Sequence, residues 1–255
     1  MERYDYLEAM KNDIREYLED NYTAEELAEA LEDVAEFETA LYDDLWIVDS
    51  VTGNVVLETG TSHAVLLKGE QIPEETFEVG DRIKVFVQEV NKESRGPLVT
   101  LSRVHQNFVK RLFELEVPEI QDGSVIIKNV CREAGSRTKI AVFSKDENVD
   151  PIGACIGPKG TRVGVIVESL GGEKIDIVVY DEDPKKFIAA ALAPANVLEV
   201  EIDEEKENSC HVTVPDTQLS LAIGNKGQNA RLAARLTGWK IDIKPESGFY
   251  IPQNS

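Results

Sequence analysis

Two short loops of the form Gly-x-x-Gly carry the residues of this chain that are best suited to binding a charged ligand. Their sequences are Gly157-Pro158-Lys159-Gly160 and Gly224-Asn225-Lys226-Gly227. Because glycine has no Cβ, a phosphate group can approach the main-chain N–H groups of such a loop without a steric cost. Each loop precedes an expected helix, where unpaired N–H groups and the helix dipole favour negative charge. The pattern therefore predicts binding of a polyanion through its backbone.

Side chains around the two loops add positive charge and an apolar contact. A lysine stands inside each loop, and arginines follow within the next two turns, namely Arg162 in the first copy and Arg231 and Arg235 in the second. An isoleucine, Ile156 or Ile223, comes directly before each loop. We expect these side chains, together with the loops, to form the binding site.

The two loops belong to an internal repeat. They are 67 residues apart, and the identical Lys-Ile-Asp-Ile segments that follow them, Lys174–Ile177 and Lys240–Ile243, are 66 residues apart. A repeat of this length is one supersecondary unit used twice. The spacing of apolar residues predicts the order helix, loop, helix and strand in each copy.

Residues at the expected helix ends agree with this order. In the first copy, Asp150 is expected to cap the helix that leads into the loop, and Gly171 to end the helix that follows the loop. In the second copy, Asp216 or Thr217 is the expected cap and Gly238 the expected end. The loops therefore lie between two short helices in both copies.

This unit resembles the KH domain, an RNA-binding module whose Gly-x-x-Gly loop clamps about four nucleotides of single-stranded backbone. One such tetrapeptide alone would be read as a simple turn. Two copies in register, each with an internal lysine and the same downstream strand, favour the RNA-binding interpretation. The chain contains neither the Gly-x-x-x-x-Gly-Lys-Ser/Thr loop of nucleotide triphosphatases nor a dinucleotide-binding Gly-x-Gly-x-x-Gly.

Longer stretches from about residue 54 to residue 247 resemble the RNA-binding half of the bacterial NusA family of transcription elongation and termination factors. The stretches that carry the likeness are Glu70–Pro73, Gly80–Val85, Leu101–Arg103, Val109–Phe113, Val117–Ile120, Arg132–Lys139, Asp150–Cys155, Ala193–Ala195 and Gln228–Ala233. The resemblance implies an OB-type barrel of the ribosomal S-one class followed by two KH domains that share an RNA-binding surface. It also implies a role in pausing, termination and antitermination by RNA polymerase. Residues 1–53 do not match this family.

The segment before the repeat has the pattern of a small β-barrel. Four short β-type runs are expected at Asn54–Glu58, His63–Leu67, Arg82–Asn91 and Leu98–Ser102, with a turn at Lys92–Pro97. An OB barrel needs five strands. Either Leu45–Val48 supplies the missing one, or the barrel is incomplete and exposes an unpaired sheet edge. Aromatic residues are few here, so we expect the barrel to contribute little to RNA binding.

The first fifty residues differ in kind from the rest. They hold 17 acidic and 3 basic residues, and so carry −14 of the total net charge of −21. Apolar residues recur at helical spacing, and Thr23–Glu26 forms a capping box. This pattern predicts an acidic helical hairpin, most simply a solvated acidic face over a small core. The NusA family would instead carry a domain that docks on RNA polymerase, and that domain is not recognised in Met1–Ser50.

The sequence therefore predicts an α+β, multidomain protein. The expected parts are an acidic helical segment over residues 1–50, a possibly incomplete OB-type barrel over 51–104, a first KH domain over 105–190, a second KH domain over 191–247, and a tail over 248–255.

Composition limits the remaining function classes. The chain has no apolar run of membrane-spanning length and an acidic N-terminus, so we expect a cytoplasmic protein without a membrane partner. Its three cysteines, Cys131, Cys155 and Cys210, are far apart and are expected to be buried thiols. Outside the first fifty residues the net charge is −7, so local basic loops can bind RNA modestly and with a steep salt dependence.

Neither a catalytic nor a metal site is expected. His63, His105 and His211 have no serine or cysteine in a recognisable nucleophile setting. The acidic triplet Asp203-Glu204-Glu205 lies between two β-type runs, Val197–Ile202 and Ser209–Val214, and is better explained as a hairpin turn than as a metal site. We therefore expect a non-enzymatic protein without a metal or another cofactor.

The function that these observations favour is binding of single-stranded nascent RNA along a groove, with phosphates at the two loops and bases beside Ile156 and Ile223. RNA polymerase is a second partner by family resemblance. Two alternatives stay open. In one, the KH pair is a scaffold and the acidic hairpin is a protein-interaction surface. In the other, the acidic segment mimics nucleic acid.

Overall fold

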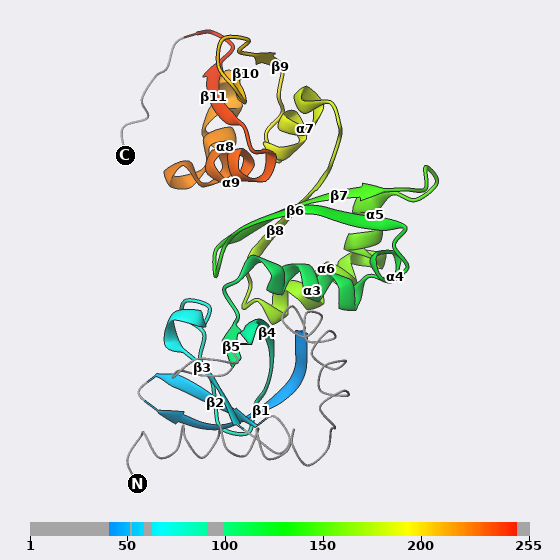
Figure 1. Cartoon of the computed structure of the whole chain (residues 1–255). Coiled ribbons are helices and arrows are strands. Elements are labelled where there is room, and N and C mark those ends of the chain that lie inside the picture. The colour runs from blue at the N-terminus through cyan, green and yellow to red at the C-terminus, as the bar shows by residue number, and fades with distance from the viewer. Residues whose placement is uncertain (1–40, 52, 59–62, 91–98, 249–255) are drawn as a thin grey trace. The chain divides into compact units, whose positions relative to one another are not determined.

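The computed structural model describes residues 41–51, 53–58, 63–90 and 99–248 (Figure 1). The expected acidic helices before residue 41, most of the tail and the turn at residues 92–97 lie outside the described residues. The chain divides into two compact units, Met1–Leu112 and Phe113–Ser255. Helix α3 (Gln106–Glu116) runs across the boundary between them.

The first unit contains a five-stranded antiparallel sheet in the order β3-β2-β1-β4-β5. Its strands are β1 (Leu41–Val51), β2 (Asn54–Glu58), β3 (His63–Leu66), β4 (Arg82–Val90) and β5 (Val99–Ser102), and a 3-10 turn, η1 (Lys68–Glu70), follows β3. Strands β2 to β5 lie where the sequence predicted them. Side chains of alternate residues point into one core, which contains Leu45, Ile47, Val55, Leu57, Leu66, Val85, Val87 and Leu101.

Strand β1 resolves the question of the missing strand. It contains Leu45–Val48 and lies at the centre of the sheet, hydrogen bonded to β2 on one side and to β4 on the other. The alternate residues Leu45 and Ile47 are buried, as the period of a half-buried strand requires. Residues 41–50 therefore belong to the sheet, and the prediction that they form part of the acidic helical segment is wrong.

The sheet curls without closing. The end strands β3 and β5 approach each other, with Cα atoms within 8 Å. No hydrogen-bonded ladder joins them within the described part of the chain. The first unit is thus a partial OB domain: all five strands are present, but among the described residues the barrel is not closed by hydrogen bonds between β3 and β5.

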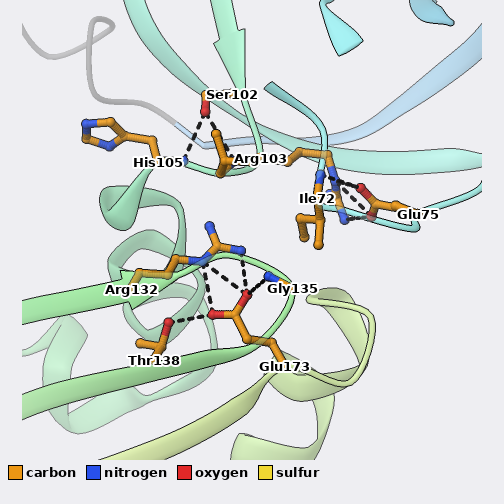
Figure 2. A network of polar contacts seen from close by, with 10 residues as sticks. Ile72, Glu75, Ser102, Arg103, His105, Arg132, Gly135, Thr138 and Glu173 are labelled. Carbon is orange, nitrogen blue, oxygen red and sulfur yellow. Dashed lines mark hydrogen bonds and ion pairs between the residues drawn. The ribbon is translucent and has the colours of Figure 1, made fainter. Parts of the chain in front are cut away.

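A buried arginine, Arg103, holds the segment that directly follows β5. Arg103 forms an ion pair with Glu75 (Figure 2). It also donates to the carbonyl of Lys84 and places its guanidinium 5.0 Å from the ring centre of Phe108. The hydroxyl of the preceding residue, Ser102, accepts the N–H of His105 at 3.0 Å, one residue before α3 begins. These contacts set the direction in which the chain leaves β5.

The second unit contains the repeat, and the two copies share one topology (Figure 1). The first comprises α4 (Pro118–Gln121), β6 (Val125–Glu133), β7 (Arg137–Ser144), α5 (Pro151–Ile156), η2 (Pro158–Gly160), α6 (Thr161–Ser169) and β8 (Lys174–Val179). The second comprises α7 (Pro184–Ala191), β9 (Glu199–Ile202), β10 (Ser209–Val214), η3 (Asp216–Gln218), α8 (Leu219–Ile223), η4 (Asn225–Gly227), α9 (Gln228–Thr237) and β11 (Lys240–Pro245).

In each copy an antiparallel hairpin is followed by two helices and a strand parallel to the middle strand. A parallel connection needs a crossover, which the helix pair provides. The predicted order of helix, loop, helix and strand is therefore confirmed in both copies. The sheets have the orders β6-β7-β8 and β11-β10-β9.

The helix ends match the sequence predictions at all but one point. Asp150 accepts the N–H of Ile152 at 3.1 Å as the cap of α5, and Gly238 ends α9 with a left-handed φ of 77°. The expected cap of α8 is wrong, because the chain first makes the 3-10 turn η3. Asp216 instead accepts the N–H of Ser247 at 3.1 Å.

A buried ion pair distinguishes the first copy from the second. Glu173 is fully buried and accepts the guanidinium of Arg132 at 2.9 and 3.0 Å, the N–H of Gly135 at 2.9 Å, and the hydroxyl of Thr138 (Figure 2). It stands in the turn where the first copy is one residue longer than the second. The β6–β7 hairpin is thereby attached to the beginning of β8.

The three cysteines are buried free thiols, as the sequence predicted. Burial raises the pKa of Cys155 to about 12 and that of Cys210 to about 11, and it also raises the pKa of Cys131. Because the thiolate is the reactive form, we expect iodoacetamide at pH 8 to label the folded protein far more slowly than the protein in denaturant. Mass spectrometry of timed samples measures the rates, and rapid labelling of a cysteine in the folded protein would contradict this burial.

Candidate nucleic-acid interface

The first loop (157–160) and the second loop (224–227) have nearly the same backbone conformation. The first glycine has φ and ψ of 72° and 173° in one copy and 78° and 171° in the other. The lysine has φ of 56° and 50°, and the last glycine has φ of 76° and 75°. Three positions of each loop therefore lie at positive φ. Two of them are glycines, the residue that adopts this conformation without steric cost, and the third is the lysine. The repeat predicted from the sequence extends to the dihedral angles of the candidate site.

The two glycines of each loop serve different purposes. A Cβ on Gly157 would lie 2.6 Å from Cγ of Arg162, and one on Gly224 would lie 2.7 Å from the backbone nitrogen of Asn229. The first glycine is thus required by the packing of the following helix. A Cβ on Gly160 or Gly227 would meet nothing within 4 Å. The backbone at the last glycine therefore has open space beside it, which a ligand needs for a close approach.

The side chains at the loop tips are accessible. Lys159 and Lys226 are exposed, as are the residues before them, Pro158 and Asn225. Among the isoleucines, Ile156 is 37% exposed and Ile223 is half-buried. Both copies thus place an exposed cation and an accessible apolar side chain at neighbouring positions of the chain.

The fifth residue after the first glycine holds the two helices together. In the first copy it is Arg162, which donates to the carbonyl of Ala154 at 2.6 Å and to Glu119 at 2.7 Å. In the second copy it is the buried Asn229, which donates to the carbonyls of Ala222 and Leu192 at 3.0 Å. Arg162 was predicted as a phosphate ligand, and the structure gives it partners within its own domain. Alignment of the two copies, which pairs it with Asn229, is the signal that could have indicated this role.

The second loop is also held by the first copy of the repeat. Arg231 donates to the carbonyl of Lys226 in the loop at 3.2 Å and to both carboxylate oxygens of Glu133, at 2.7 and 3.1 Å. Gln228 donates to Glu133 at 2.9 Å and to the hydroxyl of Ser136 at 2.8 Å. Sequence analysis missed Glu133 and Gln228. Arg235, predicted to lie beside the second loop, is an exposed residue of α9.

Charge at this contact is well defined. The hydrogen bond from Arg231, aided by that from Gln228, holds the pKa of the Glu133 carboxyl below its usual value, against a smaller effect of burial. Glu133 raises the pKa of Arg231 in turn. Both groups are therefore ionised at neutral pH, so a carboxylate stands beside the arginine near the second loop. In the first copy, the carboxylate that binds the corresponding arginine, Arg162, is Glu119 of the same domain.

Further contacts join the two copies of the repeat into one unit. Lys139 is fully buried and donates to Asp176 at 2.9 Å and to the carbonyl of Ala193, which follows α7 in the second copy, at 2.7 Å. Burial lowers the pKa of Lys139, and Asp176 opposes this effect. Asn129 of β6 donates to the carbonyl of Leu236 in α9 at 2.7 Å. One core contains Cys131 and Ala141 of the first domain together with residues of the second.

Other site classes gain no support from the described residues. Among them, no group of three or more histidine, cysteine, aspartate or glutamate side chains is placed to hold a metal ion. His211 lies in β10, beside Asp242, and Asp203 and Glu204 lie in the turn before that strand, as the sequence predicted. Within the same residues, no helix combines the length and the apolar character needed to span a membrane.

Comparison with known families agrees with this geometry. One family model, described as the NusA-like first KH domain, matches residues 103–180, and another, described as the NusA-like second KH domain, matches residues 184–250. The chain belongs to the NusA family. Its repeat is a tandem pair of NusA-type KH domains, and the loops are their Gly-x-x-Gly loops.

Curated relatives in the NusA family are similar over a large part of the chain. The "Transcription termination/antitermination protein NusA" of Halalkalibacterium halodurans is 55% identical over 193 residues, which are 76% of this chain and 50% of that protein. The protein of the same name from Bacillus subtilis is also 55% identical, over 76% of this chain and 52% of that protein. The protein of that name from Thermus thermophilus is 49% identical, over 75% of this chain and 49% of that protein. The chain spans about half the length of the curated relatives it matches.

Proposed function

We propose that the protein binds single-stranded RNA by holding its backbone at both Gly-x-x-Gly loops of the KH pair. The observation that carries this proposal is the matching conformation of the two loops, each with an exposed lysine and open space beside its last glycine. Phosphate oxygens need this combination of accessible N–H groups and a nearby cation. The two domains form one compact unit, and the proposal places one RNA strand across both loops.

The candidate residues take different parts in this proposal. The backbone of Gly157–Gly160 and Gly224–Gly227 receives phosphates, and Lys159 and Lys226 add positive charge. Ile156 and Ile223 lie beneath bases, and Arg235 contributes from the exposed side of α9. Arg162 acts mainly by holding α5 and α6, through its bonds to Ala154 and Glu119. The proposal contains no catalytic step, metal or cofactor.

In the cell, the RNA would be a nascent transcript in the cytoplasm, and its binding would affect pausing, termination and antitermination. The names of the curated relatives support this role. Contact with RNA polymerase is a further part of the proposal, and it rests on family membership alone.

Titration of a labelled single-stranded RNA with the full chain tests the proposal. The RNA needs roughly ten nucleotides or more, because one KH loop clamps about four. Fluorescence anisotropy at several salt concentrations is expected to show modest binding that weakens steeply with salt. Binding releases the counterions of the RNA phosphates, and this release becomes less favourable as the salt concentration rises. The negative net charge of −21 makes the expected affinity modest. Absence of binding at low salt would contradict the proposal and favour the protein-interaction scaffold.

A truncated protein would separate the KH pair from the acidic segment, and the structure sets where to cut. Removal of residues 1–53 would delete β1, the central strand of the first sheet. Removal of residues 1–40 keeps all five strands. The chain that lacks residues 1–40 is expected to bind RNA at least as well as the full chain, because it has lost an acidic segment that repels RNA.

A further inference from the structure

The two loops differ in how the neighbouring arginine is used. In the first copy, Arg162 is bound within its own domain, to a helix carbonyl and to Glu119. In the second copy, Arg231 reaches the loop itself, through the carbonyl of Lys226, and its other nitrogens bind the carboxylate of Glu133 in the first KH domain. One guanidinium thus separates Glu133 from the tip of the second loop.

The carboxylate of Glu133 has the geometry of a bound phosphate. It accepts Nε and a terminal nitrogen of Arg231 through its two oxygens, at 2.7 and 3.1 Å. A phosphate accepts an arginine in the same two-pronged manner. Both partners are accessible, with 42% of the Arg231 side chain and 24% of the Glu133 side chain exposed. An ion pair of this kind is weak in water and can exchange its anion.

We propose that Glu133 competes with RNA phosphate for Arg231 and so lowers the affinity of the second loop. RNA that binds there replaces the carboxylate on the guanidinium. Loss of the Glu133–Arg231 ion pair is the cost of binding at the second loop, and this cost opposes short or isolated strands. A longer RNA already held at the first loop is present at a high effective concentration and overcomes this opposition. Glu133 therefore favours RNA that spans both KH domains. This inference rests on the RNA-binding function proposed above.

The substitution Glu133→Gln tests the proposal because it removes the charge and keeps an oxygen that can accept from Arg231 or Gln228. Glu204→Gln is the matched control. It makes the same change of charge at an exposed residue, which lies in the turn between β9 and β10 and outside both Gly-x-x-Gly loops. Arg231→Gln, alone and combined with Glu133→Gln, shows whether an effect passes through the guanidinium. Circular dichroism melting of each full-length variant reports whether the fold is kept.

We expect Glu133→Gln to bind single-stranded RNA roughly three- to tenfold more tightly than the parent, the effect of about one released charge-assisted contact. The gain should be larger for an RNA of about four nucleotides than for one that spans both loops, since one KH loop holds about four. Glu204→Gln should change affinity less than about twofold, as an isolated surface charge does. In the Arg231→Gln background, the gain from Glu133→Gln should fall to that of the control.

The outcomes separate this inference from the function on which it rests. If the parent binds RNA and folded Glu133→Gln binds equally or more weakly, the competition proposal is overturned, and weaker binding would make Glu133 a positioning residue. The competition proposal is also overturned if the gain persists in the Arg231→Gln background. If neither the parent nor any variant binds RNA, both the proposed function and this inference are overturned.

Discussion

Replacement of Lys159 and Lys226 by aspartate is expected to lower the affinity for a single-stranded RNA that spans both loops by more than about tenfold, at about 1 kcal/mol or more for each lost charge-assisted contact. Both lysines are exposed and have positive φ, where aspartate is accommodated better than most residues. The substitutions therefore reverse the charge at the loop tips and keep the turn. The salt dependence should also become shallower, because fewer counterions are released.

A matched control makes this result specific to the loops. Lys145→Asp combined with Lys185→Asp makes the same change of net charge at two exposed residues outside them. This pair should lower RNA affinity much less than the loop pair. Either loop lysine changed alone should cause an intermediate loss, because the other loop still holds the strand. A folded loop double variant that binds RNA like the parent would show that these loops do not clamp RNA.

The second large effect concerns stability. Glu173→Ala is expected to lower the free energy of unfolding by about 3–5 kcal/mol, as removal of one member of a buried ion pair does. The side chains of Arg132 and Glu173 are 2% and 0% exposed, so the change leaves the guanidinium buried without this carboxylate. It also removes the acceptor of the Gly135 N–H and the Thr138 hydroxyl.

The surface pair Lys244–Glu201 provides the comparison, because about half of each side chain is exposed. Glu201→Ala should cost no more than about 1 kcal/mol. Urea unfolding followed by circular dichroism measures both variants. An equal cost for the two would contradict the assigned importance of the buried pair.

Local patterns made much of this fold predictable. The loops, the strands β8 to β11 and the end of α9 at Gly238 follow from glycine positions, apolar spacing and caps, which act over a few residues. From the sequence, a fifth strand at Leu45–Val48 was one alternative and an incomplete barrel was the other. The sequence did not decide between them, because the apolar residues Leu45 and Ile47 form only a short pattern within an acidic segment. The place of β1 depends on pairing with β4, which begins at Arg82, far along the chain.

Contacts between distant segments were not predictable from local patterns. Glu133 and Arg231 are 98 residues apart and meet only because β6 and α9 pack together. Neither residue has a neighbour in the sequence that indicates the other. The role of Arg162 is a similar case, since its partner Glu119 lies in another helix 43 residues earlier. The candidate site was therefore located from sequence, whereas the hydrogen bonds that hold it were not.

The most direct test of the central claim is an NMR titration of the isotope-labelled full chain with a single-stranded RNA that spans both loops. The account predicts that the backbone amide signals of Lys159 and Gly160 and those of Lys226 and Gly227 shift together, with the same midpoint. This result would place one RNA strand at both loops. Saturable RNA binding that leaves the amide signals of both loops unchanged would contradict the account.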